Sequence, residues 1–192
     1  RGLQFLLHFN KEQYLVKTNL KAHYNISNLL ACILVCIELK IPLKEVINII
    51  NENDLHVPYL NISKGNRGVS IIDDGYNANF TGFIAALKHL DKEQSKGKKY
   101  ILTQGIIELG VDRKDTYDDL AREIVKSADG LITSDIDLID AVKDIDKKYM
   151  VEYFDSVFDV SYIYDRVLVS DDILLIEGPF PEDVLKKIYL RE

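Results

Sequence analysis

The sequence predicts an α/β fold, a mostly parallel sheet with helices on both faces, in the larger C-terminal part of the chain. From Gly68 onward, short apolar segments of strand character alternate with segments in which apolar residues recur at helical spacing. Such alternation favours parallel strands joined by right-handed crossovers. Segment 172–177 also contains an unbroken apolar run, as expected of a strand buried on both faces.

The start of the chain predicts a β-hairpin. Segments 2–8 and 13–18 show the apolar–polar alternation of strands, and the polar run Asn10-Lys11-Glu12 lies between them.

Two helices are expected after the hairpin. The first begins at Asn25 or Ser27 and ends near Leu39. The second covers 43–51, and Pro42 before it is well placed because a missing N–H costs nothing at a helix start.

The polar segment 51–67 predicts a connection between two units. It contains Pro58 and Gly65 and has little helical period, although 57–63 is compatible with an edge strand. We therefore expect three parts, at 1–56, 57–67 (a hinge) and 68–192.

The third part is expected to hold five strands and five helices. The strands are predicted at 68–73, 99–103, 130–134, 150–154 and 172–177. The helices are predicted at 79–91, 114–128, 136–147, 157–168 and 181–190.

Composition excludes several classes of function. The formal charge of −7 and the isoelectric point near 5.2 argue against a nucleic-acid-binding surface. No run approaches the ~20 apolar residues of a membrane span, so no membrane partner is expected. The four histidines lack metal-ligand spacing. Cys32 and Cys36 fall in an apolar helix and are predicted to be buried and reduced, which fits a cytoplasmic location.

The segment Ile71–Phe80 carries the first candidate site. An apolar strand ends there in two carboxylates and a glycine, and a helix follows. Ligands bind at the carboxyl ends of strands in such sheets, so the candidate residues are Asp74, Tyr76, Asn77 and Asn79. The alternative is a helix cap, in which Asp74 or Asn79 satisfies free N–H groups. The Gly-x-Gly-x-x-Gly pattern of a dinucleotide site is absent, so a nicotinamide cofactor is not expected.

A second candidate is Glu108, in the loop after the strand at 99–103. This loop leaves the same edge of the sheet as Asp74, and we expect the two loops to meet over one crevice. The alternative is a plain turn. Glu177-Gly178-Pro179 ends another strand at the same edge.

These segments resemble the Mur ligase family. Asp-Asp-Gly-Tyr-Asn-Ala-Asn at 73–79 is similar to the opening of the family's C-terminal domain, most of all in its D-alanyl-D-alanine-adding (MurF) type. Segment 19–28 resembles Asn-Leu-x-Gly-x-His-Asn-x-x-Asn, at the end of the central ATPase domain. Segment 104–110 resembles Gly-Asp-Met-Leu-Glu-Leu-Gly.

The resemblance implies a C-terminal piece of an ATP-dependent, amide-forming ligase of peptidoglycan precursor synthesis. Residues 1–56 would end the ATP-binding domain, and 68–192 would form a Rossmann-like C-terminal domain. The full-length protein would use ATP and Mg²⁺, and its small-molecule substrates would be a UDP-muramoyl-peptide and an amino acid or dipeptide. The reaction would pass through an acyl phosphate.

The resemblance also implies roles for the candidate residues. Asp74 would accept from ribose hydroxyls or order its loop, and Tyr76, Asn77 and Asn79 would line the adenosine side of the cleft. Glu108 would order the adjoining loop. No catalytic residue and no metal ligand is assigned within this chain.

Departures from the family pattern keep a second hypothesis open. The chain lacks the Gly-x-x-x-x-Gly-Lys-Ser/Thr loop that holds nucleotide phosphates, so alone it should be inactive and should not bind ATP tightly. Pro-Tyr-Leu stands at 58–60 for Pro-Gly-Arg, and Glu-Gly-Pro-Phe stands at 177–180 for Lys-Gly-Ser-Arg. The alternative is therefore a degenerate, non-catalytic binding module, and whether the parent protein is an enzyme stays open.

Overall fold

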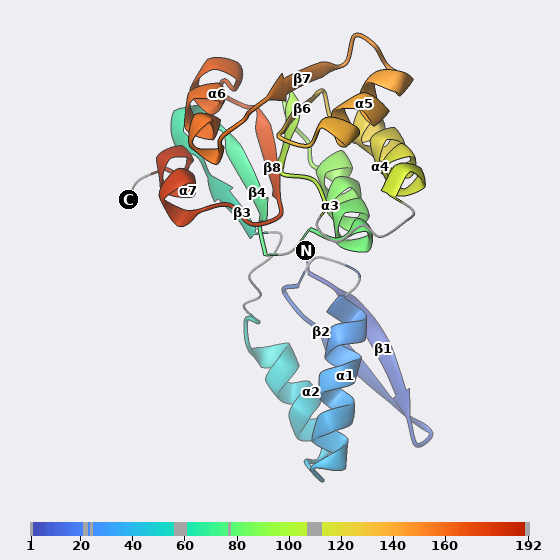
Figure 1. The fold of residues 1–192 in the computed structure, drawn as a ribbon. Helices are drawn as coiled ribbons and strands as arrows, with labels where there is room; N and C mark the ends of the chain where they lie inside the picture. The colour runs from blue at the N-terminus through green and yellow to red at the C-terminus, as the bar shows by residue number, and fades with distance from the viewer. Residues whose placement is uncertain are drawn as a thin grey trace. The chain divides into compact units, whose positions relative to one another are not determined.

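The computed structural model describes residues 2–20, 23, 25–55, 61–76, 78–106 and 113–190. The chain divides into two compact units, 1–57 and 58–192 (Figure 1), and each is described by itself.

The first unit begins with the predicted hairpin. Strands β1 (Gln4–Phe9) and β2 (Glu12–Lys17) pair antiparallel, with Phe9 opposite Glu12. The two turn residues, Asn10 and Lys11, both have positive φ, 47° and 67°. A two-residue turn of this kind matches the twist of the strands it joins, so the hairpin is tight.

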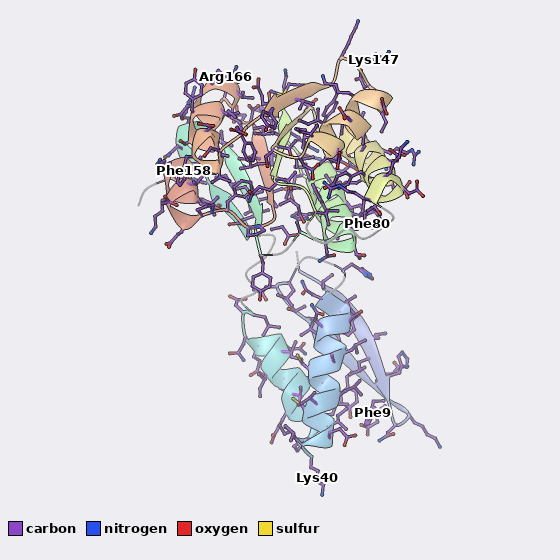
Figure 2. All side chains as sticks on the ribbon, viewed as in Figure 1. Phe9, Lys40, Phe80, Lys147, Phe158 and Arg166 are labelled. Atoms are coloured by element: carbon purple, nitrogen blue, oxygen red, sulfur yellow. The ribbon has the colours of Figure 1, made fainter. Side chains whose placement is uncertain are left out.

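Two helices complete the first unit, as predicted. They are α1 (Asn25–Glu38) and α2 (Leu43–Glu52). Lys40 follows α1 with φ 61°, a left-handed conformation that ends helices, and Figure 2 labels it together with Phe9. Apolar side chains of β2, of the segment after it, and of α1 and α2 form the core: Val16, Leu20, Leu29, Ile33, Leu43, Val46, Ile47 and Ile50.

The prediction that both cysteines are buried is wrong. Cys32 is exposed and Cys36 is half-buried, and both are free thiols. The helix α1 is apolar on more than one face, and this unit covers only one of them, so Leu34 and Val35 are also exposed. An apolar run predicts a helix here but does not predict which side is covered.

The second unit contains a six-stranded sheet in the order β3-β4-β8-β5-β6-β7. Only the edge strand β3 is antiparallel to its neighbour, so the predicted mostly parallel α/β fold is confirmed. The strands are β3 (Asn61–Lys64), β4 (Ser70–Asp74), β5 (Lys99–Thr103), β6 (Gly130–Thr133), β7 (Met150–Tyr153) and β8 (Ile173–Glu177).

Helices cover both faces of this sheet (Figure 1). On one face lie α3 (Phe80–Lys92), α4 (Arg113–Ser127) and α5 (Ile136–Ile145). On the other lie α6 (Val160–Val167) and α7 (Glu182–Ile188). Two short 3₁₀ turns are Asn66–Gly68 and Val157–Asp159. No helix in the described part is long and apolar enough to span a membrane.

The expected hinge at 57–67 differs from the structure over its second half. Residues 61–64 form β3, paired with β4, and 66–68 form a 3₁₀ turn. A polar segment can join a sheet at its edge, where one side of the strand stays in water. Residues 57–60 lie outside the described part, and the division into an ATPase remnant and a C-terminal domain stays a prediction.

The core facing α3, α4 and α5 is built from rows of side chains that run across the strands. Ile72, Leu175, Ile101 and Leu131 are in register on four neighbouring strands and are at most 1% exposed. Because successive residues of a strand alternate between faces, the residues two positions further on continue the same face.

Leu175, at the centre of this row, provides a test of the sheet. Leu175→Ala should lower the free energy of unfolding by about 3 kcal/mol, because it leaves a cavity between two buried layers. Ile136→Ala, at a side chain that is 60% exposed, is the control and should change it by less than about 1 kcal/mol. Urea denaturation of both variants measures the difference, and equal effects would contradict the described packing.

Candidate functional site

Four polar residues form a row at the carboxyl ends of four neighbouring strands. Asp74 of β4 is in register with Glu177 of β8, Glu177 with Thr103 of β5, and Thr103 with Thr133 of β6. They lie two residues beyond the apolar row and on the same face of the sheet. All four are buried, with exposures between 0% and 6%. We call this set the polar row.

The two threonines turn the chain out of the sheet. The Thr103 hydroxyl accepts from the N–H of Gly105, and the Thr133 hydroxyl accepts from the N–H of Asp135, each at 3.1 Å. Each threonine thus satisfies a backbone donor that has just left its strand. Half of the polar row therefore has a structural role.

The acid Glu177 of the polar row has no such partner among the described residues, since neither of its carboxyl oxygens is hydrogen-bonded there. Burial, and then the nearby Asp74, raise the pKa of Glu177 from 4.5 to about 10. Burial, and then Asp73, raise the pKa of Asp74 from 3.8 to about 6. At neutral pH the pair therefore holds one proton and one negative charge.

The loop after β4 is fixed by Asp73, which points to the opposite face from Asp74. Its carboxylate accepts from the N–H of Gly75 at 2.8 Å and from the hydroxyl of Tyr189, just after α7. The Tyr76 side chain beyond this turn is 69% exposed. Asn79 is the N-cap of α3 and accepts from the N–H of Gly82 at 2.9 Å.

The structure thus places the predicted site residues in different surroundings. Asp74 lies in the buried polar row, Tyr76 is at the surface, and Asn79 makes the helix cap that was considered as the alternative. Asn77 and Glu108 lie outside the described residues. Binding by these side chains stays a prediction.

The loops after β4 and β5 leave the same edge, but they do not leave neighbouring strands. β8 lies between β4 and β5, and Glu177 therefore stands between Asp74 and Thr103. The side chain of Gln104 donates to the carbonyl of Pro179 at 2.7 Å, which joins the loop after β5 to the loop after β8. Any crevice at this edge would include the end of β8.

A second carboxylate, Asp135, holds both ends of the loop after β5. At one end, the Ile106 N–H donates to the Tyr117 hydroxyl at 3.1 Å, and that hydroxyl donates to Asp135. At the other end, Arg113 donates to Asp135 at 3.0 Å. Asp135 also caps α5 through the N–H of Leu138. We call this set the Asp135 clasp.

Only glycine fits where the loop passes the Asp135 clasp. Gly105 has φ +86°, and a Cβ there would lie 2.2 Å from a carboxylate oxygen of Asp135. Burial and the hydrogen bond to Asp135 raise the pKa of Tyr117, so its hydroxyl stays a donor at neutral pH. The Asp135 clasp was not predicted from the sequence. A sequence pattern indicates only that Asp135, just before a predicted helix, is a cap residue.

The described residues do not fit a metal centre. They contain no group of three or more histidine, cysteine, aspartate or glutamate side chains suited to a metal ion. The Mg²⁺ that the family resemblance implies has no set of ligands in the described part of this chain.

Glu177 makes stability depend on pH. Between about pH 5 and about pH 9 the folded protein keeps a proton that the unfolded chain has lost, so this contribution to stability falls as the pH rises. Glu177→Gln removes it, and the melting temperature of the variant relative to wild type should therefore increase across this range. A constant difference between the two proteins would contradict a protonated Glu177.

No family model matches the sequence. A curated relative, UDP-N-acetylmuramoyl-tripeptide–D-alanyl-D-alanine ligase of Buchnera aphidicola subsp. Baizongia pistaciae (strain Bp), is 34% identical over 111 residues, 57% of this chain and 24% of the relative.

Solved structures match over nearly the whole chain. MurF ligase from Thermotoga maritima in complex with ADP matches with a TM-score of 0.66 and 19% identity over 96% of this chain and 41% of that one. A pseudomurein peptide ligase type C from Methanothermus fervidus matches with a TM-score of 0.70 and 22% identity over 96% and 40%.

The chain thus spans about a quarter of the curated relative and about two-fifths of the solved structures. At identities of 19% and 22%, the structural matches show the fold alone. The sequence match is to a ligase that adds D-alanyl-D-alanine. This chain is therefore similar in fold to Mur ligases, and over 111 residues it is similar in sequence to a D-alanyl-D-alanine-adding ligase.

Proposed function

We propose that this chain is the C-terminal part of an ATP-dependent ligase that joins an amine to a carboxylate of a peptidoglycan precursor. The match of 34% identity over 111 residues to a MurF ligase carries this proposal. The ADP complex of a MurF ligase with a similar fold supports ATP as the co-substrate. The cytoplasm, where ATP is available, is the proposed location.

The proposed reaction has two steps. The γ-phosphoryl group of ATP moves to the carboxylate and gives an acyl phosphate and ADP. The amine nitrogen then attacks the acyl carbon, phosphate leaves, and the nitrogen loses a proton as the amide forms. An acyl phosphate is hydrolysed by water, so a domain that covers the site both protects it and positions the amine.

The second unit of the chain would provide that cover. Its carboxyl edge carries the exposed Tyr76, which would contact the adenosine, and the buried polar row. We propose that Asn77 and Glu108 line the same edge. Asn79 would act through its cap, which holds the start of α3 beside the loop.

A second candidate function is a non-catalytic binding module. One observation favours it: Glu177 occupies the position where the family pattern has a lysine, and it is buried with no hydrogen-bond partner among the described residues. The sequence upstream in the parent gene separates the two candidates, because an intact Gly-Lys-Ser/Thr loop supports the ligase and a disrupted one supports the module.

The direct test is ligation by the full-length protein. We expect release of phosphate from ATP that requires both UDP-muramoyl-tripeptide and D-alanyl-D-alanine. Phosphate release that does not respond to any amine would overturn the proposal.

The chain alone should not bind Mg-ATP tightly. It lacks the phosphate loop, and with it most charge-assisted contacts to the triphosphate. Isothermal calorimetry with the 192-residue chain should show no binding at micromolar nucleotide. A micromolar dissociation constant would require a nucleotide site that this proposal does not contain.

Kinetics of the full-length protein distinguish a binding role from a structural one. Asn79→Ala removes the cap and should lower the free energy of unfolding by ~1 kcal/mol. Asp74→Ala, if Asp74 bonds a ribose hydroxyl, should raise the KM for ATP several-fold, as the loss of ~0.5–1.5 kcal/mol predicts. An unchanged KM for ATP in Asp74→Ala, with only a changed melting temperature, would assign Asp74 to structure.

A further inference from the structure

Tyr189, the residue after α7, joins the end of that helix to the loop after β4. Its hydroxyl donates to one carboxylate oxygen of Asp73, and the other oxygen of Asp73 accepts from the N–H of Gly75 at 2.8 Å. The two donors thus use different oxygens of one carboxylate. Because a carboxylate bonded at both oxygens cannot turn without losing a bond, Tyr189 restricts the side chain that holds the turn at Gly75.

The backbone of Tyr189 is fixed independently of that loop. Its N–H donates to the carbonyl of Leu185 at 3.0 Å, within the last turn of α7. The next N–H, of Leu190, donates to the carbonyl of Lys64 at 3.0 Å, and an antiparallel bridge joins Tyr189 to Gly65. The Tyr189 hydroxyl therefore reaches Asp73 from a point anchored on both α7 and the end of β3.

The Tyr189 side chain combines packing with a hydrogen-bond donor. It is half-buried and packs against the core that α6 and α7 cover. Burial, and then the hydrogen bond to Asp73, raise the pKa of Tyr189, so its hydroxyl stays protonated at neutral pH. Phenylalanine at this position would keep the packed ring and remove only the donor, which makes the role of the hydroxyl testable by itself.

The turn at Gly75 follows the position of the Asp73 carboxylate closely. A Cβ on Gly75 would lie 2.7 Å from Oδ1 of Asp73 and 3.4 Å from the carbonyl oxygen of Gly178. The turn thus lies against Asp73 on one side and the end of β8 on the other. Tyr76, whose side chain is 69% exposed, follows directly in the chain. A displacement of the Asp73 carboxylate is therefore passed through Gly75 to Tyr76.

We propose that Tyr189 is a positioning residue for the loop after β4. Through Asp73 it fixes the turn at Gly75, and with it the place at which Tyr76 meets the nucleotide. The second half of this statement rests on the function proposed above, whereas the first half concerns the chain alone.

Amide hydrogen exchange at Gly75, measured by NMR on the 192-residue chain, tests the first half. Tyr189→Phe should make this exchange about fivefold faster, because Asp73 is then held at one oxygen only. Tyr164→Phe is the matched control, since the Tyr164 hydroxyl also donates to an oxygen of this unit, the carbonyl of Asn66 at 2.7 Å, but before β4 instead of after it. It should leave exchange at Gly75 unchanged.

Asp73→Asn gives a second measurement that does not require a change at Tyr189. An amide has one acceptor oxygen, so asparagine can keep only one of the two hydrogen bonds, and exchange at Gly75 should again become faster. Adding Tyr189→Phe to Asp73→Asn should then have less effect than Tyr189→Phe alone, because both changes remove the same contact. A full further fivefold increase would mean that Tyr189 acts by another route, and would overturn the proposal.

Kinetics of the full-length protein test the second half. Tyr189→Phe should raise the KM for ATP about fivefold and leave kcat and the KM for D-alanyl-D-alanine unchanged, whereas Tyr164→Phe should change none of the three. A general loss of stability would not divide the kinetic constants in this way.

The outcomes separate the positioning role from the proposed function. Equal exchange at Gly75 in the wild type and Tyr189→Phe, or equally faster exchange in Tyr189→Phe and Tyr164→Phe, would overturn the positioning role. Faster exchange in Tyr189→Phe alone, with an unchanged KM for ATP, would overturn the link to the nucleotide and leave the ligase function standing. Faster exchange in a protein that ligates no amine would overturn the proposed function and leave Tyr189 as the residue that positions the loop.

Discussion

The second unit depends on the burial of β8. This strand, the last in the chain, lies between β4 and β5 and is covered by helices on both faces. All five of its residues are buried. Among the described strands, β8 joins the pair β3–β4 to the group β5, β6 and β7. The apolar residues of β8 carry the energy of this arrangement, since burying each such side chain stabilises the fold by about 1.5–3 kcal/mol. Its last residue, Glu177, is the exception and lies at the carboxyl edge of the sheet.

At its carboxyl edge, one face of the sheet changes from apolar to polar side chains within two residues. Two residues back, the same face holds only isoleucine and leucine, and these fill the core under α3, α4 and α5. At the carboxyl end the same face holds two threonines, which accept from backbone N–H groups, and two acids, of which Glu177 has no hydrogen-bond partner in the described part of the chain. A structural requirement explains the threonines but not the acids. Acids with strongly raised pKa values are typical of functional sites, so this pair is a candidate for one.

Much of the fold is predictable from the sequence, because helix and strand periods are local. The hairpin, both helices of the first unit and the alternation after Gly68 follow from apolar spacing and turn residues. The strand order does not follow, since an apolar run such as 173–176 predicts burial but not its neighbours. For the site, the sequence led to Asp74 and Asn79 but could not separate the buried acid from the helix cap. The Asp135 clasp joins residues from three separate elements, and no spacing rule connects them.

The Asp135 clasp has a consequence for ligand binding. Residues 106 and 113, which flank the segment that carries Glu108, are both tied to one carboxylate, Arg113 directly and Ile106 through the Tyr117 hydroxyl. Bringing the two ends of a segment together costs conformational entropy. Here the hydrogen bonds to Tyr117 and Asp135 already hold both ends in place. A ligand that contacts both residue 106 and residue 113 would not have to bring them together. Preorganisation of this kind increases affinity without adding a single contact.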